Sequence, residues 1–327
     1  AVMANYFVTG AAGFIASKVC EFLLQDGHTV IGIDNFDPAY DVRLKEWRLK
    51  RLQSQAGFTF YRDDIRDFSR LKEICSASPH LDGVINLAAK AGVRDSVLDP
   101  WSYYETNVTG TLNLLELCKQ EEIAKFILAS TSSIYGDDAP YPTPEKADSS
   151  HPLQPYAASK KAAETLSYSY HYLENIDVTV VRYFTVYGPA GRPGMSMFRF
   201  AKWIAEGEPV TIFGDGNQTR GFTYVDDIAR GTIQALKPLG YEIINLGGHQ
   251  TISINDLVKK MESLLGKKAS LKYLPAHPAD MNASWADVSK AREMLGWQPQ
   301  VSLEMGIPRL IEWYMQEHSW ASQVSTK

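Results

Sequence analysis

The sequence has few cysteines, no excess of positive charge and no long apolar runs. Its 327 residues include 3 cysteines (Cys20, Cys75 and Cys118), which are far apart and lack the spacing of metal ligands. We therefore expect a reducing, cytoplasmic location, with no disulfide framework and no metal site. The net charge is −5 and there is no basic tail, so binding to nucleic acid is not expected. No apolar run approaches the roughly 18 residues that span a bilayer, so a membrane segment is not expected either.

The chain does contain a regular alternation of strand-like and helix-like segments. Strands are predicted at residues 6–9, 29–34, 58–62, 83–88, 126–130 and 178–183, and helices at residues 13–25, 42–53, 69–76, 100–120 and 156–173. Runs such as residues 178–181 are β-branched throughout, which is typical of strands buried on both faces of a parallel sheet. The alternation predicts an α/β fold of the Rossmann type, with a doubly wound parallel sheet.

The rhythm changes after about residue 184, where short elements and Gly-Pro breaks replace the alternation. One further helix–strand pair, at residues 226–236 and 241–246, resembles the first half and is expected to return to the sheet. The 327 residues also exceed the roughly 250–300 at which a single core stops growing. We therefore expect a Rossmann domain of residues 1–183 and 226–248 and a smaller α+β lobe of residues 184–225 and 249–327.

A glycine-rich turn, Gly10-Ala11-Ala12-Gly13, follows the first predicted strand and opens the first helix. Gly10 permits a tight turn, and Gly13 lets the backbone approach a pyrophosphate where free helix N–H groups bind anions. Asp34 ends the second strand, where a carboxylate binds ribose hydroxyls and repels a 2′-phosphate. The pattern favours NAD over NADP. A purely structural turn, and a capping role for Asp34, are the alternatives.

Tyr156 and Lys160 are four residues apart in a predicted helix and therefore share one face. A free phenol has a pKa of ~10. A neighbouring ammonium group, joined by the positive nicotinamide ring of the cofactor, favours the phenolate and lowers that pKa. Tyr156 is therefore a candidate general base for a substrate hydroxyl. The strand at residues 126–130 leads into the hydroxyls of Thr131, Ser132 and Ser133, at the sheet edge where open α/β sheets bind ligands.

Together these motifs resemble the extended short-chain dehydrogenases/reductases, and within them the nucleotide-sugar 4-epimerases. The similarity covers nearly the whole chain, including residues 182–189 and 213–227. The resemblance implies NAD as cofactor, and catalysis by Tyr156, Lys160, Thr131 and Ser132. It also implies that the cofactor is bound by Gly10, Gly13, Phe14, Ile15, Asp34, Asn35, Asp64, Ile65, Leu87, Ala88, Ala89, Lys90, Tyr156, Lys160 and Tyr183.

The same resemblance distinguishes between related reactions. Dehydratases of this superfamily carry an Asp–Glu pair after the catalytic threonine, and decarboxylases carry Ser–Glu, whereas this chain has Ser132 and Ser133. Oxidation at C4 with no second step fits an epimerase. Thr185 replaces a common asparagine, and with Ser133 it adds hydroxyl donors for a C6 carboxylate, which requires donors and no nearby acid. The chain therefore looks most like the bacterial UDP-glucuronate 4-epimerases, which form UDP-galacturonate through a 4-keto intermediate.

The resemblance further implies that Arg192 and Arg220 contact the UDP part of the substrate, with a solvated loop charge as the alternative for each. It implies a homodimer in which residues 100–120 and 156–173 pack into a four-helix bundle between subunits. Trp101, Tyr104, Leu112, Tyr168 and Tyr172 supply apolar surface for it, although packing within one chain explains them equally well.

Two other functions stay open. One is a 4-epimerase of UDP-glucose or UDP-N-acetylglucosamine. The other is a non-catalytic NAD-sensing protein, which would be expected to have lost Tyr156 or Lys160.

Overall fold

The computed structural model describes residues 3–275 and 284–326, so residues 1–2, 276–283 and 327 of the predicted domains lie outside it. The largest sheet has seven parallel strands in the order β10-β6-β5-β4-β1-β2-β3. These strands are β1 (Asn5–Thr9), β2 (Thr29–Ile33), β3 (Phe58–Tyr61), β4 (Gly83–Asn86), β5 (Lys125–Thr131), β6 (Asp177–Tyr183) and β10 (Tyr241–Leu246). The parallel α/β fold is confirmed, and residues 241–246 do return to the sheet, beside β6.

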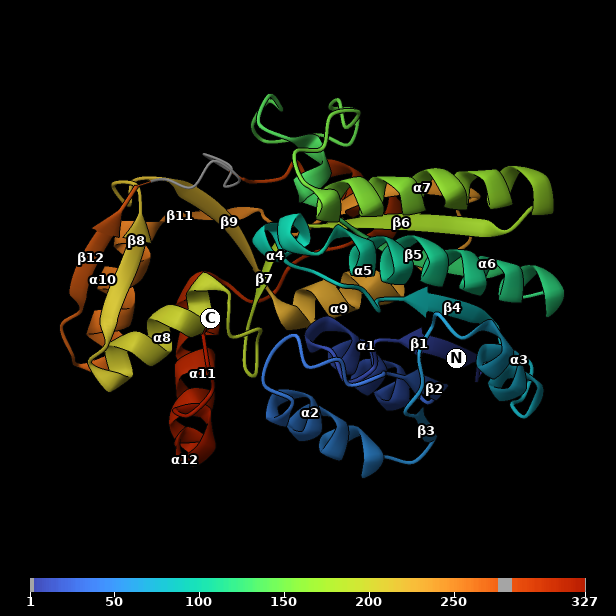
Figure 1. The fold of residues 1–327 in the computed structure, drawn as a ribbon, viewed down its shortest axis with the longest axis horizontal. Helices are drawn as coiled ribbons and strands as arrows, with labels where there is room; N and C mark the ends of the chain where they lie inside the picture. Colours follow the sequence, from blue (N-terminus) through green and yellow to red (C-terminus); the bar gives the residue numbers. More distant parts are fainter. Residues whose placement is uncertain (1–2, 276–283, 327) are drawn as a thin grey trace.

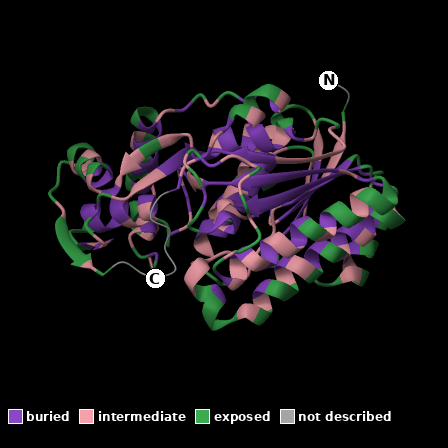
Figure 2. Ribbon diagram, turned by 90° about the horizontal axis from the view of Figure 1, so that it is seen from above, coloured by how far each residue is buried: buried purple, intermediate pink, exposed green. Residues whose placement is uncertain are grey.

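Helices cover both faces of this sheet (Figure 1). One face carries α1 (Phe14–Gln25), α2 (Arg43–Gln53) and α9 (Val225–Gln234), and the other carries α3 (Phe68–Ser76), α6 (Gly110–Gln120) and α7 (Pro155–Glu174). Alternate strand residues face the two cores, so Val8 packs on one side and its neighbour Phe7 on the other. The strands are therefore buried on both faces, as Figure 2 shows for the centre of the sheet.

The predicted helix of residues 100–120 is present as one unbroken helical segment that contains a π-helical turn. It consists of α5 (Pro100–Tyr104), the π-helical turn η1 (Glu105–Thr109) and α6. An unpredicted short helix, α4 (Val93–Leu98), precedes it. Strand β4 also ends two residues before the predicted residue 88. It ends there because the Thr9 hydroxyl accepts hydrogen bonds from the backbone N–H groups of Leu87 and Ala88, at 3.1 and 3.0 Å.

The rest of the chain builds two smaller sheets. Strands β7 (Thr185–Tyr187), β9 (Thr219–Tyr224) and β11 (Gln250–Ser253) form one, and β8 (Pro209–Phe213) and β12 (Ser270–Leu274) form the other. The remaining helical segments are η2 (Ser132–Tyr135), α8 (Ser196–Glu206), α10 (Ile254–Leu265), η3 (Ala291–Leu295), α11 (Leu303–Gln316) and α12 (His318–Ala321). Phe200, Phe222, Leu257 and Ile307 belong to the core of this smaller α+β lobe. Across the described ranges, no helix is long and apolar enough to cross a membrane.

Asp227 at the start of α9 joins the C-terminal part of the chain to the helices of the large sheet. Its buried carboxylate accepts hydrogen bonds from the backbone N–H groups of Gln300 and Val301, both at 2.9 Å. Its carbonyl oxygen accepts a further bond from the Trp297 indole at 2.8 Å. Asp227 thus anchors residues 297–301 to α9 through both its side chain and its carbonyl oxygen.

We expect Asp227→Ala to lower the free energy of unfolding by about 2–3 kcal/mol, because it leaves two backbone donors without their acceptor. Urea denaturation of the purified variant measures this change. Asp226→Ala is the matched control, since the neighbouring carboxylate forms only a 3.7 Å ion pair with Lys18. Equal losses in the two variants would contradict the anchoring role of Asp227.

Candidate active site

A cavity of about 410 Å³ lies where the carboxyl ends of β1 to β6 meet the smaller lobe. From β1 the chain adds β2 and β3 on one side and then crosses to β4 on the other, so the strand order reverses between β1 and β4. Open α/β sheets bind nucleotides in the crevice at such a point. The cavity therefore occupies the position that the fold class predicts for a ligand.

Nearly all of the predicted site residues line this cavity. Those that do are Gly10, Phe14, Ile15, Asp34, Asn35, Asp64, Ile65, Leu87, Ala88, Ala89, Lys90, Thr131, Ser132, Ser133, Tyr156, Lys160, Tyr183, Thr185 and Arg192. Gly13 and Arg220 are not among the lining residues. Gly13 closes the turn beneath the cavity, and Arg220 lies on β9, paired in register with Ile252 of β11.

The glycine-rich turn is shaped by contact between two backbones. Gly10 has a φ of +67°, and a Cβ atom there would lie 2.9 Å from the Cα atom of Ala88. The Gly13 N–H group donates to the Gly10 carbonyl at 2.7 Å, which brings the chain directly into α1. The turn thus leaves backbone and a helix N-terminus facing the cavity, as the pyrophosphate of a dinucleotide requires.

The end of the cavity beside β2 and β3 is acidic. Asp34 is buried, and its carboxylate accepts hydrogen bonds from Lys45 Nζ at 3.0 Å and from the Ala12 N–H group at 3.2 Å. Asp64 accepts hydrogen bonds from Asn35 at 2.8 Å and from the Arg66 guanidinium at 2.8 and 3.0 Å. Although burial acts in the opposite direction, the bonds from Arg66 lower the pKa of Asp64 to about 2. Both carboxylates are therefore held in place by hydrogen bonds.

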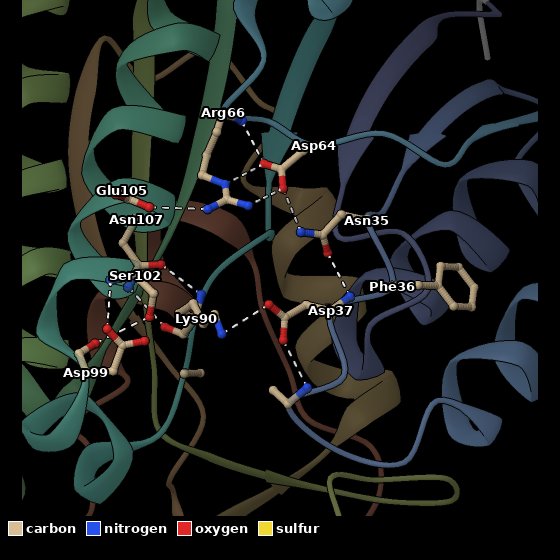
Figure 3. A network of polar contacts seen from close by, with 12 residues as sticks. Asn35, Phe36, Asp37, Asp64, Arg66, Lys90, Asp99, Ser102, Glu105 and Asn107 are labelled. Carbon is tan, nitrogen blue, oxygen red and sulfur yellow. Dashed lines mark hydrogen bonds and ion pairs between the residues drawn. The ribbon is translucent and has the colours of Figure 1, made fainter.

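Two contacts that the sequence did not reveal join the loops around this end (Figure 3). Lys90, after β4, forms a 3.1 Å ion pair with Asp37, after β2. Asn107, in η1, accepts a bond from the Lys90 N–H group at 2.9 Å and donates to the Lys90 carbonyl at 3.0 Å and to Ser159 Oγ at 2.9 Å. Asn107 thereby holds the Lys90 loop against α7. The position of Asp37 just after a strand could have suggested a site residue, but nothing in the sequence singled out Asn107.

The other end of the cavity holds Tyr156 and Lys160, which lie on the first turns of α7. Lys160 Nζ donates a hydrogen bond to the Ala129 carbonyl at 3.0 Å, and Thr131 is hydrogen-bonded to the Tyr156 phenol. The Tyr103 ring packs edge-on against Tyr156, with ring centroids 6.2 Å apart. The strand and the helix thus bring the predicted hydroxyl, phenol and amine together.

The electrostatics of this pair differ from the prediction. We expected the Lys160 ammonium to lower the pKa of Tyr156, but burial raises it. The hydrogen bond from Thr131 and the positive charge of Arg192 oppose that rise. Burial also lowers the pKa of Lys160 to about 8. Among the protein's own groups, desolvation of the pair therefore outweighs their favourable neighbours. The expected lowering also included the positive nicotinamide ring of bound NAD, and it stays a prediction.

A model of the NAD dependent epimerase/dehydratase family matches residues 6–247. The chain belongs to this family. NAD is therefore its cofactor, and the turn at Gly10 together with the carboxylate of Asp34 fits a dinucleotide.

Several relatives match over almost their whole length. A UDP-glucuronate 4-epimerase of Thermodesulfobacterium geofontis is 56% identical over 95% of this chain and 96% of its own. The crystal structure of UDP-glucuronic acid 4-epimerase from Bacillus cereus, in complex with UDP-glucuronic acid and NAD, matches with a TM-score of 0.89 at 40% identity, covering 96% of this chain and 99% of that one. A UDP-glucose 4-epimerase structure from Thermotoga maritima, with UDP-glucose, matches with a TM-score of 0.89 at 34% identity and the same coverage.

We expect Asp34→Asn to weaken NAD binding more than tenfold, because a hydrogen bond to a charged group contributes about 1.5–3 kcal/mol. Calorimetric titration of NAD into protein stripped of nucleotide measures the change. Asp41→Asn is the matched control, because Asp41 lies on the same segment and pairs with Arg43 outside the cavity. Unchanged affinity in Asp34→Asn would exclude Asp34 from the cofactor site.

Proposed function

We propose that this protein is an NAD-dependent UDP-glucuronate 4-epimerase, which forms UDP-galacturonate through a 4-keto intermediate without decarboxylation. The main support is the distribution of charge along the cavity. Its lining carboxylates, Asp34, Asp37, Asp63 and Asp64, all follow β2 or β3. Around Tyr156 the described lining offers the cations Lys160 and Arg192 and a group of hydroxyls, but no carboxylate. An anionic sugar suits that end.

The relatives support the same substrate. A structural neighbour at 40% identity contains UDP-glucuronic acid and NAD, and a relative at 56% identity carries the name of this activity. The match to a UDP-glucose 4-epimerase keeps a neutral-sugar epimerase as the second candidate. A purely NAD-sensing protein is not favoured, since both Tyr156 and Lys160 reach the cavity.

The chemistry that NAD supplies when bound is a reversible oxidation at C4 of the sugar. The protein must move the proton of the C4 hydroxyl, and Tyr156 accepts and returns it. The hydroxyls of Thr131 and Ser132 form hydrogen bonds with the C4 oxygen. Thr131 also forms a hydrogen bond with the Tyr156 phenol. The charge on Lys160 favours the phenolate. Arg192 binds the UDP group, with Arg220 as a further contact outside the cavity lining.

A glucuronate oxidised at C4 is a β-keto acid, because its C6 carboxylate is attached to C5, next to the new ketone. Such an acid loses carbon dioxide when the C5–C6 bond stands perpendicular to the carbonyl plane. An epimerase must therefore hold the carboxylate closer to that plane. Ser133 and Thr185 line the cavity at the ends of β5 and β6, and we assign the carboxylate to their hydroxyls.

The proposal includes a homodimer, the predicted division into domains and a cytoplasmic location. Large apolar side chains are exposed on α4, α5 and α7, among them Leu98 (85%), Trp101 (78%) and Tyr172 (75%), and a second copy would cover them.

Residues 1–183 and 226–248 hold NAD, and residues 184–225 with the described part of 249–327 hold the UDP-sugar. The three cysteines are buried free thiols, which fits a reducing compartment.

We expect Tyr156→Phe to lower the rate of epimerisation at least ~100-fold, which is the usual contribution of a general base, while NAD stays bound. NMR of UDP-glucuronate incubated with the protein measures the rate, and release of nucleotide on denaturation measures bound NAD. Tyr103→Phe is the control, because this ring packs against Tyr156. Near-normal turnover by Tyr156→Phe would remove the phenol from the mechanism.

We expect Ser133→Ala and Thr185→Ala to release carbon dioxide and UDP-4-keto-pentose, with NADH accumulating because the ketone is not reduced. Loss of one hydrogen bond to a carboxylate changes the ratio of the two outcomes more than tenfold. Absorbance at the NADH band and NMR of the products measure that ratio. The wild type should scarcely turn over UDP-glucose. Faster turnover of UDP-glucose than of UDP-glucuronate would instead support the neutral-sugar epimerase.

A further inference from the structure

Glu164 is a buried acid on the helix that carries the catalytic pair, yet it does not line the cavity. It lies four residues beyond Lys160 and eight beyond Tyr156 on α7, so the three side chains follow one face of the helix. Its side chain is 2% exposed. A buried carboxylate is costly unless it is paired, so its partners indicate what it does.

The partners of Glu164 come from two neighbouring strands. The Ser130 hydroxyl donates to Glu164 Oε1 at 2.6 Å, and the buried Arg182 guanidinium donates through Nε at 2.9 Å and Nη2 at 2.8 Å. Arg182 donates in turn to the Tyr135 hydroxyl at 2.9 Å. Two parallel guanidinium–carboxylate bonds fix orientation as well as distance. Glu164 is therefore bonded rigidly to β5 and β6.

Those strand positions lie immediately before the reaction site. Ser130 and Arg182 are opposite each other in the sheet, and the next pair in register is Thr131 and Tyr183, which both line the cavity. The residue before Ser130 is Ala129, whose carbonyl accepts the bond from Lys160. A single carboxylate thus holds α7 against the strand that presents both the Lys160 acceptor and Thr131.

Glu164 also places a negative charge one helical turn from Lys160. Burial lowers the pKa of Lys160 to about 8, and the charge on Glu164 opposes that effect. The other ionisable groups around the pair include two cations that pair with Glu164, Arg182 on β6 at 2.8 Å and Lys161 on α7 at 3.6 Å. The rest are Tyr156 on α7, Tyr183 on β6, Tyr135 on η2, Tyr241 on β10, Glu145 in the loop before α7 and Arg192 in the loop before α8. Burial raises the pKa of Tyr135, Tyr183 and Tyr241, so these three tyrosines are neutral near pH 7.

We propose that Glu164, through its ion pair with Arg182 and its bond to Ser130, is a positioning residue that holds α7 on β5 and β6 and keeps Lys160 charged. Its part in turnover rests on the proposed epimerase function. Its effect on Lys160 does not depend on that function.

The same two strands supply a matched control at their other end. Lys125 and Asp177 form the first pair in the register of β5 and β6, and their side chains are joined by a largely buried ion pair. Asp177 also accepts hydrogen bonds from the backbone N–H groups of Leu239 and Gly240, at 2.8 and 2.7 Å. Asp177→Asn therefore weakens a comparable ion pair between the same strands, far from the cavity.

The test compares Glu164→Gln with Asp177→Asn in NAD-loaded protein carrying ¹³C-labelled lysine. NMR follows the titration of the Lys160 side chain, whose resonance is identified by its loss in Lys160→Arg. In Glu164→Gln the midpoint should fall by about one pH unit or more, because a neighbouring negative charge is lost. The alkaline limb of the epimerisation rate should move to lower pH in the same variant, since Lys160 then loses its charge earlier as pH rises. Asp177→Asn should leave the Lys160 midpoint and the alkaline limb unchanged. Glu164→Asp should restore both quantities to their wild-type values.

An unchanged Lys160 midpoint in Glu164→Gln, or an equal fall in Asp177→Asn, would overturn the proposal. If the wild type does not epimerise UDP-glucuronate, the proposed function fails, and the Lys160 titration still decides the role of Glu164. If Glu164→Gln does not fold, the double variant Glu164→Gln/Arg182→Met takes its place in the test. It removes both charges of the buried ion pair, and proteins often tolerate that better than the loss of one charge. The Lys160 midpoint must lie below that of the wild type in this double variant as well, or the proposal is wrong.

Discussion

The close approach of the turn after β1 to the loop after β4 shapes the rest of the site. Thr9 donates to Asn86 at 2.8 Å and accepts from the backbone of Leu87 and Ala88, so the β4 loop is drawn over the end of β1. Gly10 then lies so close to Ala88 that no larger residue fits without movement. This contact forms the floor of the cavity and places the start of α1 and the Lys90 loop on either side of it. The positions of both ends of the cavity therefore depend on this contact.

The cavity is polarised along its length. At the β2–β3 end each lining carboxylate has a cationic partner. The pairs are Asp34 with Lys45, Asp37 with Lys90, Asp63 with Arg70, and Asp64 with Arg66. At the Tyr156 end the described lining has cations and hydroxyls without an acid. An adenosine that offers hydroxyl donors suits the first environment, and an acidic sugar diphosphate suits the second. The charge pattern therefore orients two ligands that share one cavity.

Much of this arrangement could be predicted from the sequence, because local patterns encode it. Continuous apolar strands identified the parallel sheet, and the positions of Gly10, Asp34 and Thr131 at strand ends identified the cavity lining. What was missed depends on contacts between distant segments. The Lys90–Asp37 pair and the bonds of Asn107 form only when loops meet across the sheet. The rise that burial causes in the pKa of Tyr156 was also missed, because a helical spacing shows which groups are neighbours but not how much water they lose.

The loss of water also explains why the catalytic helix needs a buried acid. Removing Tyr156 and Lys160 from solvent favours their neutral forms, whereas proton transfer needs a charged amine beside the phenol. Arg192 favours the phenolate, but as a cation it also disfavours the ammonium form of any lysine nearby. A negative charge one helical turn beyond Lys160, outside the cavity lining, stabilises the ammonium without contacting an acidic sugar. Glu164 meets both conditions, because Arg182 holds it on the side of α7 that packs against the sheet.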